Sequence, residues 1–132
     1  MKKELTLREK QSIFLKNIAK LILFAFENGY ELTGGELLRT QDQQMLYFEG
    51  LRLDRLGGKV RLFNSVRRSK TMLSDHLKKL ALDINLFKDG KYITNEKELW
   101  KPLHEYWKSL HPDNYSGYEW GWDMGHYGMS EK

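Results

Sequence analysis

Two histidines and two carboxylates in the second half of the chain could together hold a metal ion and use it. Asp83 stands seven positions after His76, and Asp123 stands three positions before His126. The chain has no cysteine, so any metal must be bound by His, Asp or Glu. A catalytic zinc takes three protein ligands and leaves a fourth position for water, and two histidines with one carboxylate suit it. Asp123 could then take a proton from that water and pass it to a leaving amine without binding the metal.

The residue types alone leave ordinary explanations open for the same positions. Four histidines and 18 acidic residues offer many similar combinations. His76 could be a loop histidine, Asp83 an acid at a strand edge, and His126 one member of an aromatic tail. Spacing by itself therefore does not decide between a metal site and these structural roles.

Other residues that could do chemistry are weaker candidates. His104 lies beside two tryptophans on a predicted helix, which is typical of a half-buried structural histidine. His111 lies at the end of that helix, where a cation is favourable. Glu119 is a second candidate base, although it stands seven positions before His126. Trp120 and Trp122 could pack in the core or wall a peptide cleft.

The clearest predicted element is a strand over residues 80–87, and it would carry Asp83. Apolar residues alternate along it, so one face is fully aliphatic and Asp83 lies in mid-strand on the other face. The turn at residues 88–91 should lead back into a second strand at residues 92–93.

The sequence predicts a helix at the N-terminus, over about residues 7–28. Thr6 and Glu9 have the spacing of a capping box, and Gly29 is a suitable stop. We expect most sides of this helix to be covered. Its predicted apolar face consists of Leu15, Ile18, Ala19, Ile22 and Phe26. This face is widened by Ile13, Phe14, Leu21 and Phe24.

Between and after these elements the pattern is less regular. Residues 30–32 and 36–39 indicate short strands around a glycine pair, and residues 42–48 indicate a short helix. Asn95 and Glu98 offer a capping box for a helix that runs to about Leu110. Residues 115–128 alternate aromatic residues with glycines, and so many aromatic rings need a surface to pack on.

The basic segment 52–70 contains seven basic residues and one acid, within a net charge of +4 for the whole chain. It reads as a long, partly mobile loop with a turn at Gly57-Gly58, and it suggests an anionic partner. One alternative function is therefore a small basic binding module for nucleic acid or cell wall, although no nucleic-acid recognition motif is present and nucleic acid is the less favoured partner.

Length and hydropathy set the remaining bounds. A chain of 132 residues predicts a single domain, 1–132. Its longest apolar run, residues 21–26, is far shorter than the roughly 20 residues that a membrane span needs. No signal-peptide pattern follows the first residues, so we expect the protein to be made in the cytoplasm.

Three ordered blocks resemble the zinc D,D-carboxypeptidase family, which also contains D-Ala-D-Ala dipeptidases and the L-alanyl-D-glutamate endopeptidases of phage endolysins. The blocks are an "RT…Q…LY" pattern at residues 39–47, an S-x-H-x6-D pattern at residues 74–83, and the string WGWDxxHY at residues 120–127. The resemblance covers about residues 28–128. Residues 82–92 look most like a phage-borne branch of the family.

The resemblance implies a small α+β fold that is hedgehog-like or D,D-peptidase-like, with a catalytic core over about residues 30–128. Its antiparallel sheet would carry the metal, and its helices would pack on one side. The implied roles are Zn²⁺ ligation by His76, Asp83 and His126, general base and then acid for Asp123, oxyanion or carboxylate binding by Arg39, and substrate binding by Ser74, with Trp122 as a candidate cleft wall.

Two positions depart from the family pattern. Lys79 stands where a small residue, often glycine, is usual, and it could alter the mouth of the site. Gly128 stands where many relatives carry glutamate, which puts the support of the neighbouring ligand in doubt.

The resemblance implies a peptidase of the peptidoglycan stem peptide, most closely an endolysin of the L-alanyl-D-glutamate type. Activity on D-alanyl-D-alanine remains an alternative. Such a protein would act on the cell wall after release through a holin-type pore, and we expect a monomer.

Overall fold

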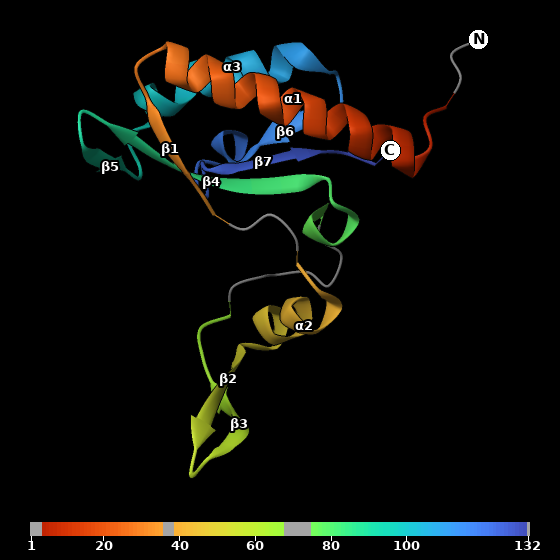
Figure 1. The fold of residues 1–132 in the computed structure, drawn as a ribbon, viewed down its shortest axis with the longest axis vertical. Coiled ribbons are helices and arrows are strands. Elements are labelled where there is room, and N and C mark those ends of the chain that lie inside the picture. The colour runs from red at the N-terminus through yellow and green to blue at the C-terminus, as the bar shows by residue number, and fades with distance from the viewer. Residues whose placement is uncertain (1–3, 36–38, 68–74, 132) are drawn as a thin grey trace.

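The computed structural model describes residues 4–35, 39–67 and 75–131 of the chain, and its α+β architecture confirms the predicted fold class (Figure 1). In chain order the elements are α1 (Leu7–Glu27), β1 (Glu31–Gly34), α2 (Gln41–Glu49), β2 (Leu51–Leu56), β3 (Lys59–Asn64), the 3-10 turn η1 (Asp75–Lys78), β4 (Ala81–Lys88), β5 (Lys91–Ile93), α3 (Lys97–Leu110), β6 (Asn114–Ser116), the 3-10 turn η2 (Gly117–Trp120) and β7 (His126–Met129).

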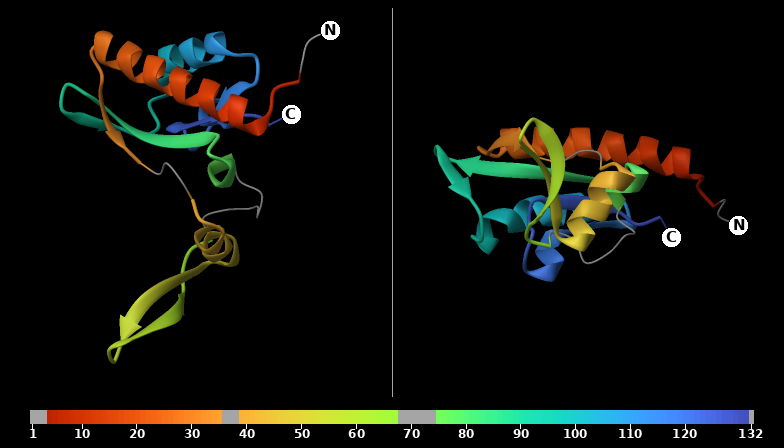
Figure 2. Two further views of the ribbon diagram at one scale, coloured as in Figure 1. Left: turned by 45° about the vertical axis from the view of Figure 1, so that its right-hand side comes forward. Right: turned by 90° about the horizontal axis from the view of Figure 1, so that it is seen from below.

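The main sheet is antiparallel and has β4 as its central strand. Its order is β1-β4-β7-β6, and β5 pairs with the far end of β4. The long helices α1 and α3 both lie on one side of this sheet (Figures 1 and 2), as the sequence predicted. The opposite face of β4 is left to carry polar groups.

The core lies between α1, α3 and the sheet. The even-numbered side chains of β4 from Leu82 to Leu86 are buried, as predicted from their alternation. Helix α3 contributes Trp100, Leu103 and Trp107, at i, i+3 and i+7 spacing. Helix α3 and strand β4 each bury one face in this core. Because side chains alternate along a strand, Asp83 lies on the other side of the sheet.

The predicted packing face of α1 is only partly correct. Thr6 caps the helix as expected, because its hydroxyl accepts a hydrogen bond from the backbone N–H of Glu9. However, Leu15 and Phe26 are exposed, so most sides of the helix are not covered. The residues that face the core are Phe14, Ile18, Leu21 and Ala25. Ile18 belongs to the predicted face, and Phe14 and Leu21 belong to the residues predicted to widen it.

The capping box predicted at the start of α3 is also wrong. The N-cap is Glu96, and no side chain caps the helix there. The Glu96 carboxylate instead accepts a hydrogen bond from the backbone N–H of Thr94 at 2.8 Å. The amphipathic face of α3 therefore holds this helix in place without a cap.

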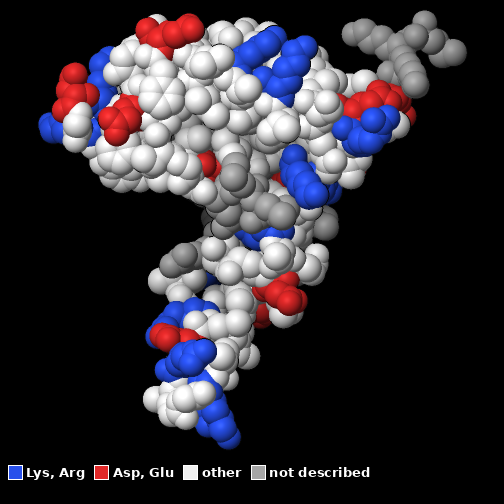
Figure 3. Space-filling model, in the orientation of Figure 1, with Lys and Arg blue, Asp and Glu red and all other residues white. Residues whose placement is uncertain are grey.

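Over residues 52–64 the basic segment forms a two-stranded hairpin instead of the predicted loop, and its residues 68–70 lie outside the described residues. β2 pairs with β3 in an unbroken antiparallel register, and Gly57 and Gly58 form the turn, both with positive φ. Helix α2 starts at the N-cap Thr40 and ends at Gly50, close to the predicted bounds. Together, α2 and the hairpin form an arm that projects from the sheet, and basic side chains gather on it (Figures 1 and 3).

Two further predictions fall partly outside this description. Residues 36–38 of the second predicted strand lie outside the described residues, and Arg39 is not in a strand. Ser74 also lies outside them. Among the described residues, no helix is long and apolar enough to span a bilayer.

Candidate metal centre

Three of the predicted site residues meet at the polar side of β4. Asp83 lies in the middle of β4, directly opposite His126 of β7 in the antiparallel register. His76 lies in η1, the turn that leads into β4. The strand pairing and the turn therefore bring together His76 and His126, which are 50 positions apart in the sequence (126 − 76).

The ligand atoms of this cluster are close enough to share one ion. Nδ1 of His126 lies 3.1 Å from Oδ1 of Asp83, and Nε2 of His76 lies 3.4 Å from the same oxygen. One donor atom from each residue lies within 4.8 Å of the others. His76 and His126 are only 2% and 7% exposed, so the fold holds both rings firmly.

The charge on Asp83 is stabilised by the two histidines. Burial alone would raise the pKa of the Asp83 carboxyl, but hydrogen bonds from His126 and His76, and their charges, outweigh it and lower that pKa to about 2. Asp83 is thus an ionised carboxylate between two imidazoles. This is the donor set that zinc, and other borderline divalent metals, prefer.

Asp123 lies beside the cluster on the turn before β7. Its φ is +53°, a left-handed conformation that is uncommon for a non-glycine residue, and its backbone oxygen accepts a hydrogen bond from the N–H of His126 at 3.0 Å. Partial burial of the carboxyl and the charge of Asp83 raise the pKa of Asp123, and the positive charges of His126, His76 and Arg39 reduce this rise. A carboxyl with a raised pKa next to a possible metal is suited to proton transfer.

Arg39 approaches the site from the arm. It precedes α2, donates a hydrogen bond to Oε1 of the buried Gln44 at 2.7 Å, and places its guanidinium 4.8 Å from the centroid of the Tyr47 ring. Its charge acts on Asp123. The segment with the "RT…Q…LY" pattern therefore holds the Arg39 guanidinium where its charge acts on Asp123.

The glycine-rich tail packs its aromatic rings around His126. The Trp120 ring centroid lies 5.2 Å from that of His126, and Trp122 lies against Trp120 at 5.4 Å. Trp122 itself is 57% exposed, so it stays a predicted wall of a substrate cleft.

Two residues near His126 were not predicted as site residues. The Tyr115 hydroxyl donates a hydrogen bond to Asp75, and it lies 3.4 Å from Nε2 of His126. Tyr115 belongs to the predicted aromatic tail, but the sequence gives no sign that β6 places this ring beside the histidine.

The structure gives physical reasons for the two departures from the family pattern. Lys79 has a φ of +59°, a conformation that glycine adopts without cost, and it lines a cavity of about 330 Å³ with Phe14 and Leu15 of α1 rather than the metal centre. At Gly128, a Cβ would collide with the ring of Tyr115. The Tyr115 ring therefore occupies the space that a side chain at position 128 would need.

A cavity of about 350 Å³ adjoins the cluster on the side of β5. Asp83 and Asp123 form part of its wall, and the neutral polar residues Asn85, Thr94 and Asn95 form another part. The cavity is large enough for part of a peptide. It lies next to Asp123, the candidate base, and to Asp83, a candidate metal ligand.

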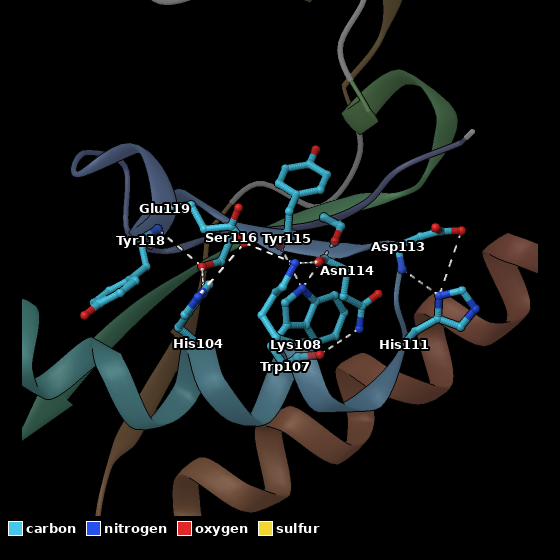
Figure 4. A network of polar contacts seen from close by, with 11 residues as sticks. His104, Trp107, Lys108, His111, Asp113, Asn114, Tyr115, Ser116, Tyr118 and Glu119 are labelled. Carbon is cyan, nitrogen blue, oxygen red and sulfur yellow. Dashed lines mark hydrogen bonds and ion pairs between the residues drawn. The ribbon is translucent and has the colours of Figure 1, made fainter.

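The other histidines and Glu119 belong to a different network, between α3 and the segment of β6 and η2 (Figure 4). Nδ1 of His104 lies 2.7 Å from the hydroxyl oxygen of Ser116, and burial lowers the pKa of His104. Glu119 forms an ion pair with Lys108 at 3.4 Å, so it does not face the metal centre. His111 contacts Asp113 at the end of α3.

No family model matches the chain, and no curated protein matches it. Among solved structures, the chain is similar to the Serratia marcescens L-Ala D-Glu endopeptidase ChiX, with a TM-score of 0.62 and 15% sequence identity over 89% of this chain and 77% of that one. The chain has a ChiX-like fold. The predicted fold is thus confirmed by a structural match, and the described residues of the chain contain a candidate His-Asp-His metal site.

Proposed function

We propose that the protein is a zinc-dependent peptidase that hydrolyses the L-alanyl-D-glutamate bond in peptidoglycan stem peptides. The observation that carries this proposal is the convergence of His76, Asp83 and His126 on one point in a fold similar to that of an L-Ala D-Glu endopeptidase. We propose zinc as the metal and the stem peptide as the substrate. Two imidazoles and one carboxylate suit zinc with an open position for water.

The residues around the cluster divide the work of peptide hydrolysis between them. A zinc ion in this site would lower the pKa of bound water toward about 7 and polarise the scissile carbonyl. The Asp123 carboxylate takes the proton of the attacking water and then donates it to the leaving amine. Asp83 does not compete for this proton, because its carboxylate is held ionised between the histidines.

Arg39 supplies a positive charge that acts on Asp123. Its guanidinium can bind the oxyanion or a substrate carboxylate at two points, and its hydrogen bond to Gln44 fixes its direction. D-glutamate carries such a carboxylate. Among the described residues, none that lines the cavity on the β5 side is basic, so we infer that the substrate carboxylate lies toward Arg39 and the remaining peptide toward this cavity.

The biological setting is part of the proposal. The likeness of residues 82–92 to a phage-borne branch supports a phage endolysin that reaches the wall through a holin-type pore. Release of D-alanine from a D-alanyl-D-alanine end would use the same centre, and it is the main alternative reaction.

The test is mass spectrometry of the fragments released from purified peptidoglycan. We expect wild type to separate L-alanine from D-glutamate, and Asp123→Asn to lose turnover by about 10²-fold or more. Glu119→Gln is the matched control, because Glu119 is an acid of the same segment that faces away from the site. Release of D-alanine alone would assign the other bond, and equal turnover by the Asp123 variant would contradict the proposed base.

The basic hairpin favours a second candidate function, which is binding of a polyanion such as nucleic acid. Its strands carry Arg52, Arg55, Lys59 and Arg61 against the single acid Asp54. Binding through phosphates would weaken steeply with salt. Filter binding at low and high salt checks this, and weak retention that salt does not change would exclude it.

A further inference from the structure

We propose that Tyr115 and Asp75 are positioning residues that hold His126 with its Nδ1 directed at the metal. This inference rests on the proposed function, because it assigns a purpose to contacts that matter only if His126 is a ligand. It adds two residues to the site, and each lies on a different element from the histidine that it would orient.

The two nitrogens of His126 face different partners. Nδ1 is turned toward Asp83 and the cluster, and Nε2 is 3.4 Å from the Tyr115 hydroxyl oxygen. A nitrogen that binds a metal must be free of its proton, and a neutral imidazole keeps one proton on the other nitrogen. With Nδ1 as ligand, the proton of His126 must therefore be on Nε2, where an acceptor is needed.

Asp75 makes the Tyr115 oxygen that acceptor. A tyrosine hydroxyl can donate one hydrogen bond, and Tyr115 donates its own to the Asp75 carboxylate. Its lone pairs remain available, and His126 Nε2 is the ring nitrogen that they meet. The order of donors and acceptors then runs in one direction, from His126 through Tyr115 to Asp75.

The hydrogen bond between Tyr115 and Asp75 also links the turn that carries His76 to the strand pair that carries His126. Asp75 directly precedes His76 in η1, and Tyr115 of β6 lies opposite Gly128 of β7, two residues after His126. The absence of a side chain at Gly128 gives the Tyr115 ring its place. The Tyr115 and His126 rings lie 5.7 Å apart at 33°. One phenol thus links the positions of both imidazoles.

The decisive experiment compares Tyr115→Phe with Tyr118→Phe in the full chain. Phenylalanine keeps the ring over Gly128 and removes only the hydroxyl. Tyr118 is a tyrosine of the same segment that stacks on His104 instead of His126, so it is the matched control. The primary measurement is zinc affinity by competition with a chelator, and we expect Tyr115→Phe to bind about 10- to 100-fold more weakly, with Tyr118→Phe unchanged.

A second measurement separates positioning from a merely structural role. In the zinc-loaded, ¹⁵N-labelled protein, the Nε2 proton of His126 should be observable and protected from exchange in wild type and in Tyr118→Phe. It should exchange faster in Tyr115→Phe. Asp75→Asn gives an independent variant, which should also weaken zinc binding because the neutral amide is a poorer acceptor for the phenol.

The possible outcomes distinguish this inference from the proposed function. If wild type binds no zinc, the proposed function fails and this inference fails with it. If wild type binds zinc and both tyrosine variants bind it equally well, only the positioning role is overturned. If Tyr115→Phe lowers thermal stability but leaves zinc affinity and Nε2 exchange unchanged, Tyr115 is structural and the proposal is likewise overturned.

Discussion

The main sheet and the β2–β3 hairpin are both antiparallel, but they bury their side chains very differently. In β4 most side chains are buried or half-buried, whereas nearly every residue of β2 and β3 is exposed. Leu86 of β4 is fully buried, and Leu62 of β3 is 59% exposed. The candidate ligands belong to the sheet and its adjoining turn, where packing on the opposite face fixes the backbone, and such rigidity is what a metal site requires.

The hairpin has a regular antiparallel register of its own. Its register places Leu53 opposite Leu62 on one face, and Asp54 opposite Arg61 on the other. A two-stranded hairpin alone is at best marginally stable in water, and α2 packs against β2 to support it. The arm thus exposes charged and apolar side chains, while the sheet and its adjoining turn hold the candidate metal ligands.

The comparison predicts its largest effect for the same substitution made in the two regions. Leu103→Ala removes a fully buried side chain from α3 and should lower the free energy of unfolding by about 2–5 kcal/mol. Leu62→Ala in the hairpin should change it by less than about 0.5 kcal/mol. Denaturant unfolding measures both. Equal losses would show that the hairpin is packed as tightly as the core.

Arg39 sharpens the comparison, because it stands at the start of the arm and we propose that it acts in the site. Arg39→Gln should reduce kcat by about 10²-fold if the guanidinium stabilises an oxyanion, with zinc affinity unchanged. Arg55→Gln, in the hairpin, is the control and should leave kcat on a soluble muropeptide as it is. A rise in KM alone would assign Arg39 to binding of a substrate carboxylate.

Acid titration should affect the two regions differently in the metal-free protein. The pKa of Asp83 is lowered to about 2, so its ionised form stabilises the fold above its ordinary pKa near 4, and this contribution is lost as the pH falls toward 2. The advantage of wild type over Asp83→Asn in thermal unfolding should therefore shrink over that range. The exposed Asp54 also has a lowered pKa, because of a backbone hydrogen bond from Arg55 and its contact with Arg52. Asp54→Asn should have little effect in moderate salt. A pH-independent difference at Asp83 would contradict this account.

The smallest effect expected is on attraction to the wall. Replacing Arg55, Lys59 and Arg61 by glutamine together should weaken binding to intact peptidoglycan severalfold, and added salt should remove the difference. Turnover of a soluble muropeptide should be unchanged, because these residues lie in the hairpin. A loss of soluble turnover would instead place the hairpin in the substrate cleft.

The sequence predicts the sheet better than the arm for a physical reason. Strict alternation over residues 80–87 fixes both the strand and its inward face. The segments LRLDRL and KVRLFN of the predicted loop also alternate, but both faces of this hairpin are largely exposed, so no buried face stabilises it as a strand pair in the sheet. In α1, more apolar positions exist than one face can use, so the sequence does not determine which of them meets the core.

The site shows the same division. His76, Asp83 and His126 could be proposed from the sequence because they lie in blocks that resemble the family motifs, although spacing alone left structural roles open; that His126 meets Asp83 depends on the pairing of β7 with β4. Tyr115 could not be proposed, since its contact with His126 depends on the register between β6 and β7 and on the space that Gly128 leaves. Contacts of that kind are set by pairing of distant segments and leave no local pattern.

The most direct test of the account is the zinc content of the purified protein after removal of metal and reconstitution. We predict one zinc ion per chain for wild type and for His104→Ala, whose histidine lies in the separate network of α3, and none for His126→Ala. Wild type that retains no zinc, or His126→Ala that retains as much as wild type, would contradict the assignment of the metal centre.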